Sequence, residues 1–174
     1  MSVNSSSVFL VVMGVAGCGK SSLGQSLAAA LQLPLIEGDD HHSAASRTKM
    51  SQGVPLTDAD REGWLTELGQ LLQARPGGAV LTCSALKKAY RDRLRAACPS
   101  LRFAFLQIDR AESEARVKAR AQTHFFSAAL VDSQFATLES PVGEPGVLRL
   151  DACLPIQQLQ AQATAWLAQT ELAP

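Results

Sequence analysis

Hydrophobic residues along the chain follow two patterns: short continuous runs, and longer segments in which they recur every three or four residues. Residues 8–13 (VFLVVM) form a continuous apolar run, which is typical of a central strand buried on both faces. Leu23, Leu27 and Leu31 then recur at every fourth position on a segment that begins near Lys20. This spacing predicts an amphipathic helix whose apolar stripe packs against the strand.

The same two patterns continue along the rest of the chain. Further strands are predicted at residues 35–37, 79–83, 103–108 and 147–150, and further helices from the capping residues 57–60 to the turn at 76–78, over about 86–97, and around 156–167. Because strand-like and helix-like segments alternate, we predict the α/β class, with a five-stranded parallel sheet in a three-layer α/β/α arrangement. We expect a single domain over residues 1–174, in which residues 1–7 are flexible.

A glycine-rich loop follows the first predicted strand and leads into the first predicted helix. Residues 14–21 (GVAGCGKS) have the Gly-x-x-x-x-Gly-Lys-Ser spacing, in which glycines let successive backbone N–H groups turn toward phosphate oxygens. Lys20 can reach the β- and γ-phosphates, and the hydroxyl of Ser21 can ligate a magnesium ion that bridges them. The alternative, a flexible turn followed by a lysine, does not account for the strand before it and the helix after it. The predicted nucleotide-binding residues here are Gly14, Val15, Ala16, Gly17, Cys18, Gly19, Lys20, Ser21 and Ser22.

Composition favours small ligands over polymers. The 174 residues are 47% hydrophobic, which is enough for one substantial core, and the formal net charge is +0. We therefore expect no nucleic-acid partner and no membrane partner. The four cysteines have neither zinc-site nor redox-dithiol spacing, and the first residues lack the basic start of a signal peptide. These features favour a reducing, cytoplasmic setting.

Acidic residues after the second predicted strand bear on the type of nucleotide chemistry. Asp39 lies where a carboxylate can orient a substrate hydroxyl during in-line phosphoryl transfer, and Glu37 is a candidate to hold magnesium through a water molecule. The alternative is that Asp39 and Asp40 are turn residues that cap the next helix. The third predicted strand ends in residues 82–84 (TCS) without an acidic residue, so Ser84 is a second candidate for a water-mediated metal contact. The chain has no Asn-Lys-x-Asp motif, which disfavours a GTPase.

Basic side chains in two segments could contact anionic ligands. Arg116 and Arg120 lie in a region of about residues 116–137 that could close as a lid over the nucleotide and neutralise developing charge. The alternative is a solvated helix face. The basic group at residues 87–93 either holds an anionic substrate or solvates a helix, and its pattern does not distinguish the two.

Two further kinds of side chain have a simple interpretation. His41 and His42 are adjacent, and no Cys or His lies at a complementary spacing, so we predict substrate hydrogen bonding rather than protein-bound zinc. Trp64 and Trp166 lie at apolar positions of predicted helices, and we assign both to the core.

Several motifs, taken together and in order, resemble the thermoresistant-type gluconokinases, which are relatives of shikimate kinase and adenylate kinase. The motifs that carry this resemblance lie at residues 14–21, 38–42, 49–50, 53–61, 64–65, 83–88, 90–92, 124–125, 133–135, 138–139 and 141. They span most of the chain, and their order along it is more specific than any single motif.

The resemblance implies a nucleoside-kinase-like P-loop fold with a helical lid, and the transfer of a phosphoryl group from ATP to D-gluconate with magnesium. It also implies a homodimer. Asp39 matches the family's hydroxyl-orienting carboxylate, and Arg120 would lie near the adenine or the phosphates. The implied catalytic residues are Lys20, Asp39 and Arg120. Arg116 and Arg120 are also implied to bind the nucleotide. The implied substrate-binding residues are Asp39, His42, Lys49, Arg61, Lys87, Arg91 and His124.

The chain departs from the family pattern at three places. Ser43 stands where proline is usual, Ser46 stands where asparagine is usual, and the stretch at residues 120–125 (RAQTHF) is one residue longer than Arg-x-Gly-His-Phe and lacks its glycine. Two alternatives therefore stand beside gluconate phosphorylation. One is another small-molecule kinase of the same fold, of shikimate or nucleoside monophosphate type, and the other is a nucleotide-binding module without turnover. The intact Lys20 and Asp39 argue against the second.

Overall fold

The computed structural model describes residues 6–120 and 128–171. The flexibility expected for residues 1–7 falls mostly outside this part of the chain. In order, the elements are β1 (Val8–Met13), α1 (Lys20–Leu31), β2 (Leu35–Glu37), the 3-10 helix η1 (Gly38–His41), α2 (Ala44–Ser51), α3 (Asp58–Gln73), β3 (Gly78–Thr82), α4 (Lys88–Ala97), β4 (Arg102–Gln107), α5 (Arg110–Arg120), α6 (Ala128–Thr137), β5 (Val147–Asp151) and α7 (Ile156–Glu171).

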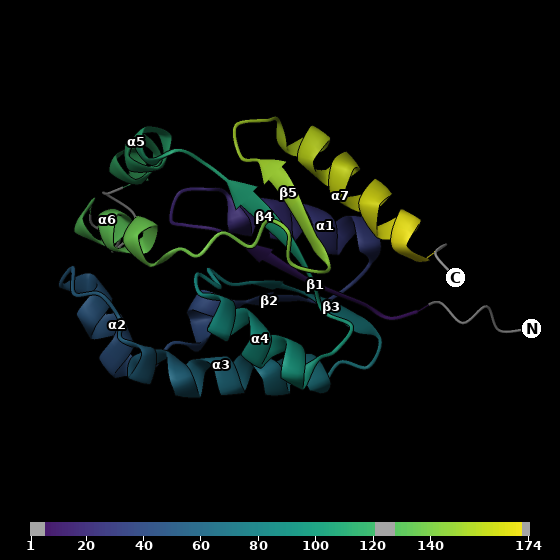
Figure 1. Ribbon diagram of the computed structural model, residues 1–174, viewed down its shortest axis with the longest axis horizontal. Coiled ribbons are helices and arrows are strands. Elements are labelled where there is room, and N and C mark those ends of the chain that lie inside the picture. Colours follow the sequence, from purple (N-terminus) through teal and green to yellow (C-terminus); the bar gives the residue numbers. More distant parts are fainter. Residues whose placement is uncertain (1–5, 121–127, 172–174) are drawn as a thin grey trace, which may run out of the picture.

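The five strands form one parallel sheet in the order β2-β3-β1-β4-β5. Figure 1 shows this sheet between two helical layers, with α1 and α7 on one face and α3 and α4 on the other. The predicted five-stranded parallel sheet and its α/β/α layering are therefore confirmed. The central strand β1 lies between β3 and β4, so the connections that follow it lead to opposite sides of β1. The strands are parallel, and the loops after β1, β2 and β3 therefore meet at the edge formed by the carboxyl ends of the strands.

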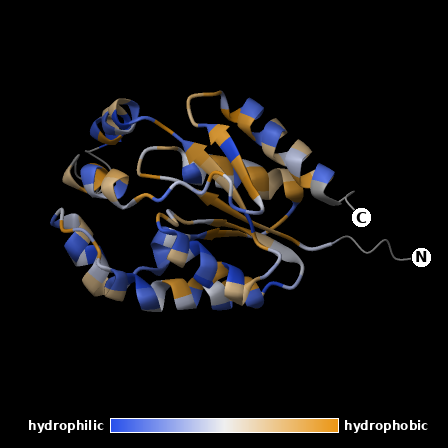
Figure 2. Cartoon of the chain, viewed as in Figure 1, coloured by the Kyte–Doolittle hydropathy of each residue, from blue (hydrophilic) through white to orange (hydrophobic). Residues whose placement is uncertain are grey.

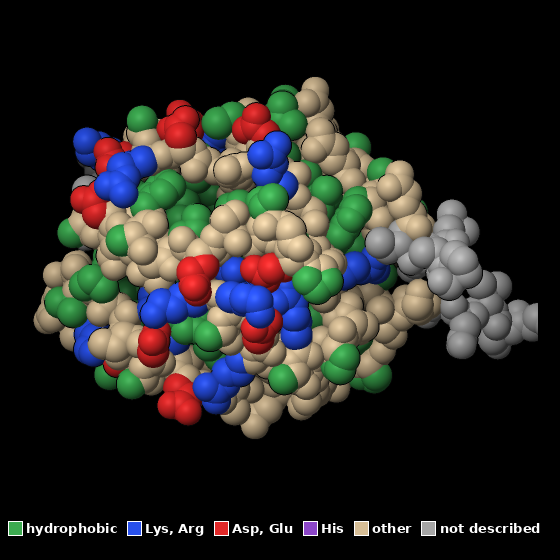
Figure 3. Space-filling view, viewed as in Figure 1, with side chains coloured by type: hydrophobic (Ala, Val, Ile, Leu, Met, Phe, Trp, Pro, Cys, Tyr) green, Lys and Arg blue, Asp and Glu red, His purple; other side chains and the backbone are tan. Residues whose placement is uncertain are grey.

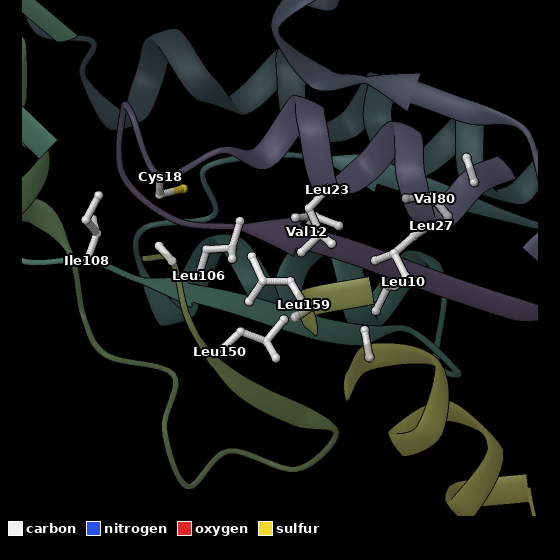
Figure 4. Packing of buried hydrophobic residues seen from close by; sticks show 14 of the residues in the cluster. Leu10, Val12, Cys18, Leu23, Leu27, Val80, Leu106, Ile108, Leu150 and Leu159 are labelled. Atoms are coloured by element: carbon white, nitrogen blue, oxygen red, sulfur yellow. The ribbon is translucent and has the colours of Figure 1, made fainter. Parts of the chain in front are cut away.

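Alternate residues of β1 enter two different cores. Leu10 and Val12 pack with α1 and α7, whereas Val11 and Met13 pack with α3 and α4. The strand β1 is therefore buried on both faces, as its continuous apolar run predicted. Figure 2 shows the apolar strands inside and hydrophilic residues on the outer helix faces. Figure 4 shows the first core, with Leu10, Val12, Cys18, Leu23, Leu27, Val80, Leu106, Ile108, Leu150 and Leu159 labelled.

Local sequence signals also account for the start of α3. The Thr57 side chain accepts the backbone N–H of Asp60 at 3.1 Å, and the Asp60 carboxylate accepts the backbone N–H of Thr57 at 2.8 Å. This reciprocal capping box satisfies donors that the first helical turn leaves unpaired. No helix within residues 6–120 and 128–171 combines the length and the apolar character needed to cross a bilayer.

The hydrophobic pattern did not predict α2, because only Ser46 among its residues is buried and no apolar stripe exists. Instead, the helix is stabilised at its start by a polar contact. The Ser43 hydroxyl oxygen accepts the backbone N–H of Ser46 at 3.1 Å, and the two hydroxyls are also 3.1 Å apart. The two serines that depart from the family pattern therefore form the N-terminal cap of α2.

Candidate active site at the carboxyl ends of the strands

A pocket lies at the edge of the sheet where the loops after β1, β2 and β3 meet. The phosphate loop and α1 form one side, η1, α3 and the 55–56 segment form a second, and α5 and α6 form a third. The sequence-predicted site residues that line this pocket are Ala16, Gly17, Gly19, Lys20, Ser21, Ser22, Asp39, His42, Arg61, Ser84 and Arg120. Parallel-sheet topology thus brings together residues that are more than 100 positions apart in the chain.

The phosphate loop is folded so that Lys20 spans it. The Lys20 ammonium donates to the carbonyls of Gly14 at 3.0 Å and Val15 at 3.1 Å. Gly19 immediately precedes α1 with a φ of 94°, and no acidic residue lies in the first turn of that helix. The positive end of the α1 dipole therefore lies at the phosphate loop, and no carboxylate in the first turn of α1 neutralises it. This end of the helix favours binding of an anionic group.

Glu37 connects the phosphate loop with two strand ends. Its Oε2 accepts the Ser21 hydroxyl at 3.1 Å and the Thr82 hydroxyl at 2.6 Å. A hydroxyl and a carboxylate thus lie side by side, which is an all-oxygen donor set of the kind that Mg²⁺ prefers. Among the described residues there is no cluster of three or more His, Cys, Asp or Glu that could hold a metal. Ser21 and Glu37 consequently fit a magnesium ion that also takes phosphate oxygens and water.

Asp39 lies in the pocket on η1, and its side chain is 75% exposed. The His42 ring, whose Nε2 is 3.7 Å from Asp39 Oδ1, lowers the pKa of this carboxyl, and the charges of Lys20 and Arg47 lower it further against the opposing effect of desolvation. Asp39 is therefore ionised at neutral pH. An ionised carboxylate of low pKa is suited to accept and orient a hydroxyl hydrogen rather than to remove the proton before phosphoryl transfer begins.

The tight turn before Asp39 requires glycine at position 38. A Cβ at Gly38 would lie 2.2 Å from the carbonyl oxygen of Thr82. The Gly38 N–H also donates to the Thr82 hydroxyl at 3.3 Å. The end of β3 therefore fixes where the chain leaves β2, and with it the place of Asp39.

The two adjacent histidines have different surroundings. His42 lines the pocket, its side chain is only 5% exposed, and its Nδ1 is buried with no hydrogen-bond partner among the described residues. His41 instead contacts Glu67, with Nδ1 2.8 Å from Oε1, and is not part of the pocket lining. Of the two, only His42 is placed to contact a pocket ligand.

Among the four cations predicted to bind substrate, only Arg61 lines the pocket. Its Nη1 donates to the Leu56 carbonyl at 2.7 Å and the Tyr90 hydroxyl at 3.2 Å, and its guanidinium lies 5.4 Å from the centroid of the Tyr90 ring. Lys49 is paired with Asp60 at 2.8 Å, and Lys87 is paired with Asp58 at 3.0 Å. Arg61 is therefore held in place on one edge of its guanidinium, while Nε and Nη2 have no partner among the described residues.

The structure corrects the prediction for Arg91. This side chain is 0% exposed, and its three nitrogens donate to the carbonyls of Ala85, Leu86 and Glu139 and to the carboxylate of Glu144, with the shortest contact at 2.6 Å. Burial raises the pKa of Glu144, but hydrogen bonds from Arg91 and Arg95 outweigh it and lower that pKa. Arg91 thus joins α4 to the 139–144 segment and has no N–H left for substrate. Figure 3 shows that the surface over α4 instead carries interspersed basic and acidic side chains.

The described parts of the predicted lid region are the end of α5 and all of α6, and His124 lies outside the described residues. Arg120 lines the pocket. Arg116 does not. It donates to Glu112 at 2.8 Å and to the carbonyls of Gly17 at 3.3 Å and Ala152 at 3.2 Å, so it joins α5 to the phosphate loop and to the segment after β5.

Several residues of the pocket lining were not predicted, and most of them are apolar side chains, whose positions in the sequence do not distinguish a pocket wall from the core. The unpredicted lining residues are Met50, Pro55, Leu56, Trp64, Val117, Leu130, Ser133 and Gln134. Trp64 belongs to the core, as predicted, but one side of it also faces the pocket. A signal for Gln134 was present, since it lies in a motif that carries the family resemblance.

Comparison with known proteins agrees with this geometry. A family model described as an AAA domain matches residues 9–143. The chain is 45% identical to a gluconokinase of Gluconobacter oxydans, over 82% of this chain and 81% of that protein, and 39% identical to the thermoresistant gluconokinase of Escherichia coli, over 87% and 88%. The crystal structure of a gluconokinase from Sinorhizobium meliloti matches with a TM-score of 0.87 and 41% identity, and it covers 95% of this chain and 94% of that one. The chain, a kinase with the P-loop fold, therefore belongs to the gluconokinase family.

Proposed function

We propose that this protein transfers the γ-phosphoryl group of ATP to D-gluconate and forms ADP and 6-phospho-D-gluconate. The observation that carries the proposal is the meeting of the phosphate loop, the Asp39 carboxylate and the Arg61 guanidinium in one pocket. These three groups match the three parts of the reaction: a polyphosphate donor, a hydroxyl nucleophile and an anionic acceptor. The names of the relatives support gluconate as that acceptor.

The reaction requires little covalent chemistry from the protein, because phosphoryl transfer is catalysed mainly by positioning and by charge. Asp39 accepts a hydrogen bond from the attacking hydroxyl and takes its proton as the new O–P bond forms. Lys20 and Arg120 line the same pocket and supply positive charge for the phosphate oxygens. The apolar residues Met50 and Leu56 help exclude water, which would otherwise compete as the acceptor.

Arg61 is our candidate for the cation that binds the gluconate carboxylate. A guanidinium can form two parallel hydrogen bonds with a carboxylate, and Nε and Nη2 form such a pair of donors. The ion pairs of Lys49 and Lys87 and the burial of Arg91 leave these three cations less suited to the task.

We propose Mg²⁺ as the metal, with Ser21 as a direct ligand and Glu37 as a ligand through water. When bound, the ion neutralises charge on the β- and γ-phosphate oxygens. Support comes from the contact between the Ser21 hydroxyl and Glu37 at the start of α1.

We further propose that the protein acts in the cytoplasm as a homodimer built from a single domain, and that the region of residues 116–137 acts as a lid. Cys18, Cys83, Cys98 and Cys153 are all free, which suits a reducing compartment. The dimer and the lid rest on the family resemblance. Sedimentation at micromolar concentration tests the dimer.

The function is tested by coupling ADP release to a spectrophotometric readout with MgATP and a panel of acceptors: gluconate, shikimate, nucleoside monophosphates and other sugar acids. We expect gluconate to give the highest kcat/KM, and a Lys20→Ala variant to serve as the blank. Turnover of another acceptor with none for gluconate would contradict the proposal. A rise in Tm with MgATP but no turnover with any acceptor would instead identify a binding module.

A further inference from the structure

The peptide groups of Ala16 in the phosphate loop are held by side chains from both helices on the third side of the pocket. Gln134 Oε1 on α6 accepts the Ala16 N–H at 2.7 Å, and the Ser113 hydroxyl on α5 donates to the Ala16 carbonyl at 2.7 Å. Both partners are about a hundred residues away in sequence. A loop that must aim several N–H groups at phosphate oxygens is thus fixed at its tip by tertiary contacts as well as by its glycines.

Packing around the loop tip supports the same conclusion. Ala16 forms a small apolar cluster with Val117 of α5 and Val131 of α6. Gly17 has a φ of +75°, and a Cβ there would lie 3.1 Å from the Ser113 carbonyl oxygen. The tip therefore packs closely between α5 and α6, and the hydrogen bond that Gln134 accepts from the Ala16 N–H is part of this packing.

The orientation of the Gln134 amide follows from its partner. A backbone N–H can only donate, so the amide atom that meets Ala16 N is the oxygen, and the other terminal atom is the NH₂ group. Gln134 lines the pocket, and Nε2 has no partner within residues 6–120 and 128–171. The amide thus uses its acceptor on the loop and keeps two donors for another group.

We propose that Gln134 has two roles: Oε1 positions the phosphate loop, and Nε2 donates a hydrogen bond to an oxygen of a reactant in the pocket. This inference rests on the proposed function, since ATP and gluconate are the reactants considered. Both reactants are rich in oxygen acceptors. When a reactant displaces water from the pocket, the Nε2 donor must find a new hydrogen-bond partner, because a buried donor without one is costly. The oxygen belongs either to the phosphates or to gluconate, and the experiment distinguishes the two.

A pair of substitutions separates the two roles. Gln134→Glu keeps an oxygen acceptor for the Ala16 N–H but removes the NH₂ donor, whereas Gln134→Leu removes both. Asp132→Asn is the control on the same helix, because the Asp132 side chain is exposed and, within the described part of the chain, its polar contact is the surface ion pair with Arg110. The measurements are Tm, the Kd for MgATP by calorimetry, and kcat and KM for ATP and for gluconate.

For Gln134→Glu we expect a Tm within about 2 °C of the parent and a fall in kcat/KM of about tenfold or more, as one lost hydrogen bond in a pocket predicts. An increase in KM and Kd for ATP assigns the oxygen to the phosphates, and an increase in KM for gluconate assigns it to the acceptor. For Gln134→Leu we expect the same fall in kcat/KM together with weaker MgATP binding and a lower Tm, because the loop tip loses the hydrogen bond between the Ala16 N–H and Gln134.

The two roles fail separately. If the kcat/KM of Gln134→Glu stays within twofold of the parent value, donation by Nε2 is excluded. Donation is also excluded if 0.5 M KCl restores the activity of Gln134→Glu to that of the parent, because salt screens the repulsion by the new charge but does not restore the lost donor. Unchanged Tm and MgATP affinity in Gln134→Leu would exclude loop positioning. If the parent protein itself fails to phosphorylate gluconate, the proposed function fails, while the MgATP affinities of the variants still test Gln134.

Discussion

The imidazole ring of His42 stacks on the indole ring of Trp64, with centroids 4.2 Å apart and an angle of 20° between the planes. The indole N–H also donates to the Gly38 carbonyl at 2.7 Å. A single side chain from the middle of α3 therefore fixes the turn on both sides of Asp39. This arrangement explains how a largely exposed carboxylate keeps a defined position, because the segment that carries it is fixed before and after it.

Asp39→Asn should preserve MgATP binding and lower kcat for gluconate by about 10²- to 10⁴-fold, because an amide cannot take the proton of the attacking hydroxyl. The measurements are the Kd for MgATP and steady-state kinetics. Asp40→Asn is the matched control, since Asp40 is exposed and does not line the pocket. Unchanged turnover in Asp39→Asn would remove this residue from its role.

Arg61→Ala should raise the KM for gluconate by about 10- to 100-fold and leave the KM for ATP within about twofold, because the substrate carboxylate loses a charge-assisted hydrogen-bond partner. Arg61→Lys should recover part of this loss. Lys88→Ala serves as the control, since Lys88 forms a surface ion pair with Asp92. A gluconate KM that stays at the parent value would assign the carboxylate to another cation.

Glu144→Gln should destabilise the fold by about 3–5 kcal/mol, because the fully buried Arg91 guanidinium would lose the charge that compensates it. Urea unfolding measures this change, with the exposed Arg93→Gln as control. The KM for gluconate should not change under conditions in which the variant is folded. An increase in that KM without loss of stability would instead place Arg91 in the substrate site.

The capping box of α3 predicts a dependence of stability on pH. Lys49 donates a hydrogen bond to Asp60 and, with the backbone N–H of Thr57, lowers the pKa of that carboxyl to about 2 from 3.8. Because the folded pKa is the lower one, this stabilisation is complete above about pH 4 and is lost as the pH falls toward 2.

The Asp60→Asn variant checks this dependence. The difference in Tm between the parent and the variant should be largest near pH 7 and should shrink at pH 2.5. Asp58 has a lowered pKa as well, from its hydrogen bonds with Tyr90 and Lys87, so Asp58→Asn is a useful comparison. A difference that stays constant from pH 7 to pH 2.5 would show that the ionised carboxylate is not what stabilises the cap.

The sequence by itself determined the strands, the helices α1, α3, α4 and α7, and the phosphate loop. These features depend on neighbours within a few residues: an apolar run makes a buried strand, Thr57 and Asp60 cap a helix together, and glycines permit the loop. Asp39 was also predictable, because the end of a parallel strand places its next residues at the ligand-binding edge. The sequence did not predict the polar helix α2, because this helix has no apolar stripe.

Only the tertiary structure decided which of several similar side chains face the pocket. Arg61 and Arg91 are both basic residues in predicted helical segments, yet one lines the pocket and the other is buried against Glu144. Gln134 meets the phosphate loop across 118 positions of the chain. Such choices depend on how distant helices pack on the sheet, and no local pattern encodes that packing, because the energy of a contact depends on what surrounds it after folding.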